Sequence, residues 1–214
     1  MKSIYTSTLV LMSFLVAGSS QAGLITVDPG TGTTTTFTQT GLTTTAGPVV
    51  LDGISITGAP QFSYGNVGYG LQSNGGWNSS WVATNNGNST VTFDLGGLFG
   101  FVGGFMNYSV FSSGQVDGSN PTIEALASDM TVLEAYDIHT LAPISTPGAT
   151  NGGAFRGIQR AVADISFFRI GGGYILTRDL ISGDPADQQV PVPATVALFG
   201  LGLAGLGWSR RKKA

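Results

Sequence analysis

The chain has 214 residues, of which 10% are charged and none is cysteine. The absence of cysteine excludes disulfides, zinc–thiolate sites and thiol catalysis. Between two apolar ends lie twelve carboxylates and four arginines, which give that part a formal charge of −8, whereas the whole chain carries −3. Such an acidic surface repels nucleic acid and anionic lipid, so we expect no nucleic-acid-binding role.

Residues 1–22 have the three parts of a secretory signal peptide. Lys2 precedes an apolar run over residues 9–17, and a small-residue pattern, Ser-Gln-Ala, ends at Ala22. This pattern predicts cleavage between Ala22 and Gly23, and therefore export of the residues that follow.

Two segments of unusual composition come next. Residues 31–45 contain ten threonines. Because threonine favours strands, this segment is predicted to be an edge strand or a loose exposed segment. A site of O-glycosylation or surface contact is the alternative.

Residues 64–90 are rich in glycine and asparagine and carry Tyr64, Tyr69, Trp77 and Trp81. Aromatic rings among small polar residues can stack on sugar rings while neighbouring amides bond the hydroxyls, so these four residues are candidate glycan contacts. The alternative is that Trp81 packs into the core and the loop is merely long.

From Gly23 to about Ser182, short β-rich runs separated by Gly, Asn, Ser and Pro recur, and no convincing helical period extends beyond two turns. Val91, Phe93 and Leu95 alternate with polar residues, which gives one buried and one solvated face. The pattern predicts an all-β fold, an antiparallel β-sandwich, in a single exported domain over residues 23–182. The expected strands are 91–95, 104–110, 122–126, 130–138, 165–170 and 174–181.

The connections between these strands are also expected from composition. Residues 127–129 are predicted to turn a hairpin, and Gly171-Gly172-Gly173 to join two adjacent strands. Residues 138–154 are predicted to form a loop rich in Pro, Thr and Gly.

Catalytic motifs are absent from the sequence. His139 is the only histidine, and Glu124 and Glu134 are the only glutamates; a solvated face of the predicted hairpin explains both carboxylates. Metal-assisted hydrolysis needs several His or carboxylate ligands, and there is no His-Glu-x-x-His or Gly-x-Ser-x-Gly motif. The sequence favours a protein that is not an enzyme, with no cofactor, no catalytic residue and no metal site. A glycosidase-like hydrolase using aspartates is the third hypothesis.

The C-terminal part has four features in order. A polar linker over 183–189 precedes the motif Val190-Pro191-Val192-Pro193, and residues 194–208 are uncharged and predict a short transmembrane helix. The tail carries Arg210, Arg211, Lys212 and Lys213. The glycines of 200–205 match the spacing Gly-x-Gly-x-x-Gly, but the chain leaves no room for the βαβ unit that dinucleotide binding requires.

Cationic flanks stay in the cytoplasm, so both ends are predicted to face inward and the acidic body outward. The order of the Pro-x-Pro motif, an apolar segment rich in Gly, Ala and Leu, and a basic tail over 190–214 resembles the PEP-CTERM sorting signal. Val192 stands where that family usually has Glu. The resemblance implies that an exosortase, an integral-membrane cysteine protease, recognises the motif and cuts the protein from its tail.

The rhythm of the strands resembles the jelly-roll-like bodies found ahead of such signals, and this resemblance carries over no functional residue. Together these features predict a non-enzymatic protein that is held in the inner membrane as a precursor and then reaches the cell surface or the extracellular matrix. The alternative is a carbohydrate-binding module that contacts exopolysaccharide. The expected partners are therefore the exosortase, the inner membrane and exopolysaccharide.

Overall fold

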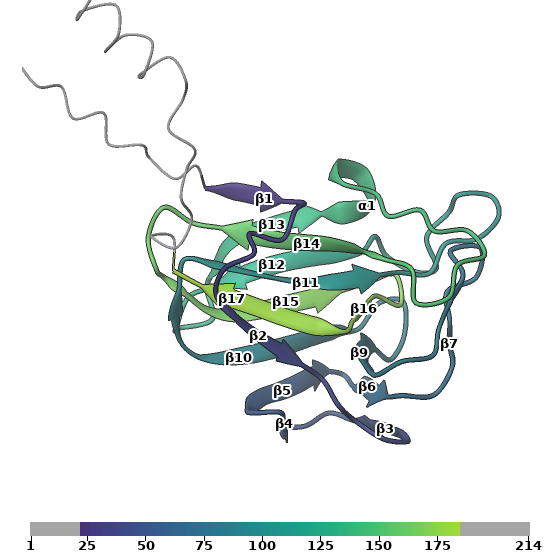
Figure 1. The fold of residues 1–214 in the computed structure, drawn as a ribbon, viewed down its shortest axis with the longest axis horizontal. Helices are drawn as coiled ribbons and strands as arrows, with labels where there is room; N and C mark the ends of the chain where they lie inside the picture. The colour runs from purple at the N-terminus through teal and green to yellow at the C-terminus, as the bar shows by residue number, and fades with distance from the viewer. Residues whose placement is uncertain (1–21, 185–214) are drawn as a thin grey trace, which may run out of the picture.

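The structure is a computed structural model and describes residues 22–184. These residues form antiparallel strands in two large sheets and one small ribbon, with a single short helix, α1 (Ile138–Leu141) (Figure 1). The all-β antiparallel fold predicted from the sequence is confirmed. Among the described residues, no helix has the length and apolar character needed to cross a membrane. The predicted C-terminal helix lies outside the described residues.

The larger sheet contains nine strands and forms one face of the molecule. Its continuous path is β1 (Gly23–Ile25), β14 (Ala154–Gln159), β11 (Phe101–Asn107), β16 (Leu176–Thr177), β9 (Trp81–Thr84), β6 (Phe62–Gly65) and β3 (Leu42–Thr45). Two further strands complete it, β17 (Asp179–Gly183), which pairs with β11, and β2 (Thr33–Thr36), which pairs with β17.

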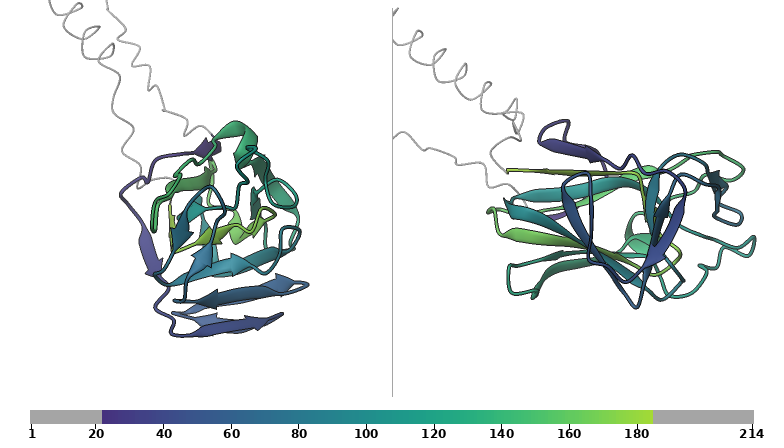
Figure 2. Two further views of the ribbon diagram at one scale, coloured as in Figure 1. Left: turned by 90° about the vertical axis from the view of Figure 1, so that its right-hand side faces the viewer. Right: turned by 90° about the horizontal axis from the view of Figure 1, so that it is seen from below.

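The smaller sheet contains six strands and packs on the first (Figure 2). Its order is β13 (Val132–Asp137), β12 (Thr122–Leu126), β15 (Ile165–Gly171), β10 (Thr90–Phe99), β5 (Ile54–Ala59) and β4 (Val49–Leu51). The ribbon pairs β7 (Tyr69–Gly70) with β8 (Gly76–Trp77).

The main core lies between the two large sheets. Val91, Phe93 and Leu95 of β10 are buried, as their alternation predicts. The ring of Phe93 lies 5.9 Å from that of Phe37 and 6.4 Å from that of Phe168, measured between centroids. Burial of one such side chain contributes roughly 1.5–3 kcal/mol. The fold therefore depends on apolar burial, as a chain without cysteine requires.

The hairpin of β12 and β13 confirms the prediction most closely. β12 has the bounds expected for it, and the amide of Ala127 donates to the carbonyl of Thr131 at 2.9 Å across the turn. β13 ends one residue before its expected end because Asp137 caps α1, accepting the amide of Thr140. The expected loop over 138–154 therefore begins with a helical turn.

Two predicted features of the C-terminal half are wrong. The single strand expected over 174–181 is split at Arg178 into β16 and β17. The glycines at 171–173 do not join neighbouring strands of one sheet, because β15 belongs to the smaller sheet and β16 to the larger. Gly172 has φ +70°, and a Cβ atom there would lie 2.3 Å from the carbonyl oxygen of Asn120. Only glycine allows the chain to cross between the sheets at this point.

The threonine-rich segment forms edge strands, as expected. β3 ends the continuous path of the larger sheet, and β2 pairs with β17 alone. Most threonines of these two strands are exposed. The strands from β4 to β9, in contrast, lie in a region for which no strands were predicted.

The two ends of the described body lie at the same end of the larger sheet. Gly23 pairs with Gln159, Gln159 with Phe101, and Phe101 with Gly183. These residues form one row across β1, β14, β11 and β17, so the two ends are about 14 Å apart at about 4.8 Å per strand. β17 extends one residue into the predicted linker.

The carboxylate of Asp52 fixes the connection between β2 and β3 to the turn between β4 and β5. It accepts the amide and the hydroxyl of Thr38, each at 3.0 Å, and the amide group of Gln39 at 3.0 Å. The hydrogen bond from the Thr38 amide is the main reason why the pKa of Asp52 lies below its ordinary value of 3.8.

A lowered pKa gives this carboxylate a pH-dependent effect on stability. Its contribution is complete above the unfolded value of 3.8 and is lost as the pH falls through the folded value. We expect Asp52→Asn, which tolerates the φ of +49° found here, to lower Tm slightly near neutral pH and much less at about pH 2.5. Thermal unfolding at the two pH values measures the difference, and an equal loss at both would contradict this role.

Candidate functional site

The four aromatic residues predicted to contact glycans have different environments. Trp77 and Trp81 are each only 1% exposed, whereas Tyr64 and Tyr69 are partly buried. Trp77 packs on Phe105, with ring centroids 6.0 Å apart. Both indoles are almost completely buried, which argues against direct stacking of either on a sugar, although Trp81 contributes to the lining of the pocket described below. The alternative of core packing by Trp81 is confirmed.

The buried Trp81 packs against Tyr69. Its indole Nε1 donates to the carbonyl of Val67 at 2.9 Å, and its ring centroid lies 4.7 Å from that of Tyr69. The hydroxyl of Tyr69 donates to the carbonyl of Thr84 at 3.0 Å. The Tyr69 ring is therefore held by a tilted aromatic contact with the indole and by a hydrogen bond from its hydroxyl, which together restrict its rotation.

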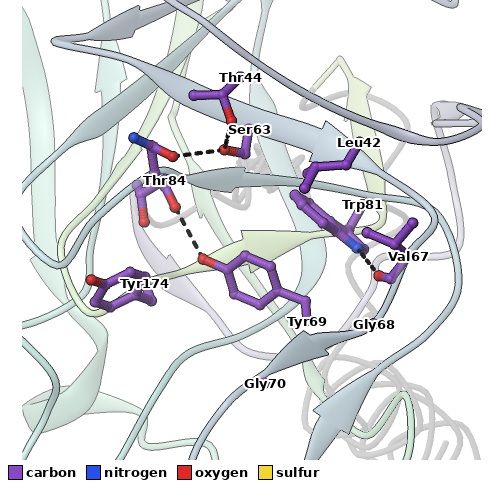
Figure 3. A pocket seen from close by; sticks show the side chains of 11 residues that line it. Leu42, Thr44, Ser63, Val67, Gly68, Tyr69, Gly70, Trp81, Thr84 and Tyr174 are labelled. Atoms are coloured by element: carbon purple, nitrogen blue, oxygen red, sulfur yellow. Dashed lines mark hydrogen bonds between the residues drawn. The ribbon is translucent and has the colours of Figure 1, made fainter.

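These residues line a pocket of about 290 Å³ beside β3, β6 and β9 of the larger sheet (Figure 3). Aromatic and small apolar residues share the lining with hydroxyl and amide groups. The lining residues are Leu42, Thr44, Ser63, Val67, Gly68, Tyr69, Gly70, Trp81, Thr84, Asn85 and Tyr174. Of the four predicted aromatic residues, the pocket thus brings Tyr69 and Trp81 together.

A chain of hydroxyl groups crosses the wall formed by β3 and β6. The hydroxyls of Thr44 and Ser63 lie 2.8 Å apart, and Ser63 donates to Oδ1 of Asn85 at 2.9 Å. Burial raises the pKa of Tyr69 well above its ordinary value, with the nearby Tyr174 and Asp117 adding to the shift. Since the lining includes no Asp, Glu, Lys, Arg or His, the pocket is uncharged at neutral pH.

Tyr174 is the lining residue that the sequence analysis missed. It follows the three glycines that cross between the sheets and has a φ of +47°, which is rare for a bulky side chain. Its ring faces the same pocket as that of Tyr69 (Figure 3). Nothing in the sequence around this tyrosine indicates that it lines a pocket, because its position depends on how the chain crosses between the sheets.

A second, smaller groove lies on the outer face of the smaller sheet. It measures about 170 Å³ and is lined by Ser55, Thr57, Thr92, Asp94, Met130 and Phe167. It contains one carboxylate and one aromatic ring.

The two glutamates and the histidine considered for catalysis each contact a polar side chain of the body. Glu134 pairs with Arg160 at 2.8 Å, and Glu124 pairs with Arg169. Nδ1 of His139 lies 3.3 Å from the hydroxyl of Tyr108. Within residues 22–184, no group of three or more His, Cys, Asp or Glu side chains is arranged to hold a metal ion.

The residues predicted for export and sorting lie at or beyond the limits of the structure. Ala22 is exposed and directly precedes Gly23, the first residue of β1. The sorting residues and the basic tail lie outside the described residues. They are Val190, Pro191, Val192, Pro193, Arg210, Arg211, Lys212 and Lys213.

Comparison with known families identifies the C-terminal part. The family model of the PEP-CTERM protein-sorting motif matches residues 189–212. The match includes the Pro-x-Pro motif with its variant Val192 and the basic residues up to Lys212. The predicted resemblance is therefore confirmed, and it supports export of the chain and its sorting through an exosortase. No curated protein matches the chain.

Proposed function

We propose that this chain is a non-enzymatic protein of the cell surface or extracellular matrix, released from the inner membrane by an exosortase. A signal peptide delivers residues 23–184 across the membrane, and the C-terminal segment holds the precursor there until it is cut. The match of residues 189–212 to the PEP-CTERM protein-sorting motif carries this proposal.

The geometry of the body supports a tethered precursor. Gly23 and Gly183 lie on one row of the larger sheet, so the chain enters and leaves the body at the same end. β6, β7 and β9, which contribute to the pocket, lie toward the other end (Figure 1). A membrane segment that follows Gly183 would hold the end with Gly23 and Gly183 near the bilayer. The pocket would then face away from the membrane.

The charge of the body supports the same arrangement. All twelve carboxylates lie between Asp28 and Asp187, against four arginines. Repulsion from anionic lipid keeps such a body off the membrane surface once the tail is cut, which favours release. The ion pairs of Glu124 and Glu134 are consistent with a structural use of both glutamates rather than with acid–base catalysis.

A reporter fusion tests the export step. Alkaline phosphatase, which is active only after export, is fused after Ser182, and we expect activity that is lost when residues 1–22 are deleted. The deletion is the matched control, because it leaves the body and the reporter unchanged. A fusion that is inactive with the signal peptide present would contradict export.

Carbohydrate binding is the second candidate function, with exopolysaccharide as the partner. The specific observation in its favour is the uncharged pocket that contains Tyr69, Tyr174 and several hydroxyl groups. Aromatic faces next to hydroxyl and amide groups suit the apolar and polar sides of a sugar ring.

A further inference from the structure

We infer that the pocket between β3, β6, β9 and Tyr174 binds one neutral sugar residue, with Tyr69 and Tyr174 as its aromatic contacts. The inference rests on the second candidate function and specifies its site and its ligand class. It replaces the tryptophans expected from the sequence by two tyrosines, one of which the sequence did not single out.

The size and charge of the pocket limit the ligand class. Ligand pockets generally measure about 300–1,000 Å³, so a volume of about 290 Å³ suits a ligand of one ring rather than a long chain of contacts. No charged residue lines the pocket, although the exported part carries a formal charge of −8. An anionic ligand would find no cation to pair with, and a cationic ligand would find no carboxylate in the wall. A neutral ligand fits best.

One of the two aromatic contacts, Tyr69, is fixed before a ligand arrives. Tyr69 is held by Trp81 and by the carbonyl of Thr84, so little side-chain entropy remains to be lost on binding. The buried Trp81 thus acts as a positioning residue for the exposed part of the Tyr69 ring.

The polar groups of the wall complement a sugar rather than a purely apolar ring. Oδ1 of Asn85 accepts the hydroxyl of Ser63, which leaves the amide N–H groups of Asn85 to donate to a ligand hydroxyl. The oxygen of Tyr69 donates its proton to Thr84 and can still accept. Donors and acceptors therefore stand beside the aromatic faces, as the edge of a sugar ring requires.

The backbone of Tyr174 gives independent support. A φ of +47° favours glycine or asparagine, and two of the three preceding residues, Gly172 and Gly173, also have positive φ. A bulky residue with positive φ carries backbone strain, and such strain is found most often at binding and active sites. The strain at Tyr174, in the wall of a pocket, therefore favours a binding role. The smaller groove on the other sheet lacks these features, since it offers Phe167 and a carboxylate in about 170 Å³.

The test uses the full chain in a zwitterionic detergent without a sugar headgroup, applied to an array of neutral and anionic glycans. Three forms are compared, the unaltered chain, Tyr174→Asn and Phe111→Ala. Tyr174→Asn removes the ring and suits the positive φ, so it should keep or raise Tm. Phe111, which is 40% exposed and outside the pocket, provides the matched control for loss of an exposed aromatic ring.

We expect the unaltered chain to bind at least one neutral glycan. Affinity should fall about tenfold or more in Tyr174→Asn, the loss of one aromatic contact, and remain unchanged in Phe111→Ala. Binding to no neutral glycan, binding to anionic glycans alone, or equal binding by Tyr174→Asn would each overturn the inference. Sorting is measured separately by the C-terminal mass of the surface protein, so failure of this test leaves the sorting proposal untouched.

Discussion

Replacement of both Pro191 and Pro193 by alanine is expected to keep the protein in the inner-membrane fraction. Each proline fixes φ near −65° and holds the preceding residue extended, which is the shape that a protease cleft accepts. Without them, residues 190–193 can join the apolar helix predicted to follow. We expect the released form to fall at least about tenfold, the effect of about 1.4 kcal/mol on recognition. Immunoblots of membrane and extracellular fractions measure the change.

Pro185→Ala is the matched control for this substitution. Pro185 lies in the predicted linker and outside residues 189–212, which match the sorting motif. The control should release the protein as the unaltered chain does. If the double variant were released in the same amount as the unaltered chain, the hypothesis that the protease recognises the Pro-x-Pro motif would be wrong.

Asn74→Ala is expected to destabilise the body by about 3–5 kcal/mol. The amide nitrogen of Asn74 lies 2.8 Å from Oδ1 of Asn107, 3.1 Å from the carbonyl of Tyr108 and 3.0 Å from that of Ile144. Its Oδ1 accepts the amide of Thr146 at 2.9 Å. Truncation removes this partner from the carbonyls of Tyr108 and Ile144 and from the amide of Thr146, at about 1–3 kcal/mol for each that stays buried and unpaired, while Oδ1 of Asn107 still accepts the amide of Tyr108. Urea unfolding followed by circular dichroism gives the free energy of unfolding.

Asn78→Ala separates this effect from the general loss of an asparagine. Asn78 is exposed and its Oδ1 accepts one hydrogen bond from Asn151 at 2.9 Å. Water can replace that bond, so we expect a loss below about 1 kcal/mol. Equal losses in the two variants would show that the buried position of Asn74 contributes nothing.

The parts of the fold predicted from the sequence are those with a strong local pattern. The alternation at Val91, Phe93 and Leu95 identified the buried face of β10. β12 was predicted with its observed bounds, because a run of apolar residues ends at the polar turn of 127–129. The C-terminal signal was recognised because its three parts follow one another in the chain and need no folding to be seen.

The parts that were missed depend on contacts distant in sequence. Residues 49–84 contain six short strands. Their many glycines and asparagines interrupt the alternation of apolar and polar residues by which a strand is recognised. Composition alone could not show that Trp77 and Trp81 are buried. An exposed loop could have the same composition. The polar network of Asn74 and the position of Tyr174 arise only when segments tens of residues apart meet.

The mass of the protein recovered from the cell surface tests the central claim most directly. Intact-mass and C-terminal peptide measurements on that material should find a chain that begins at Gly23 and ends before Trp208. Surface material that still contains Trp208 and the basic residues Arg210 to Lys213 would contradict cleavage and indicate a permanent anchor instead.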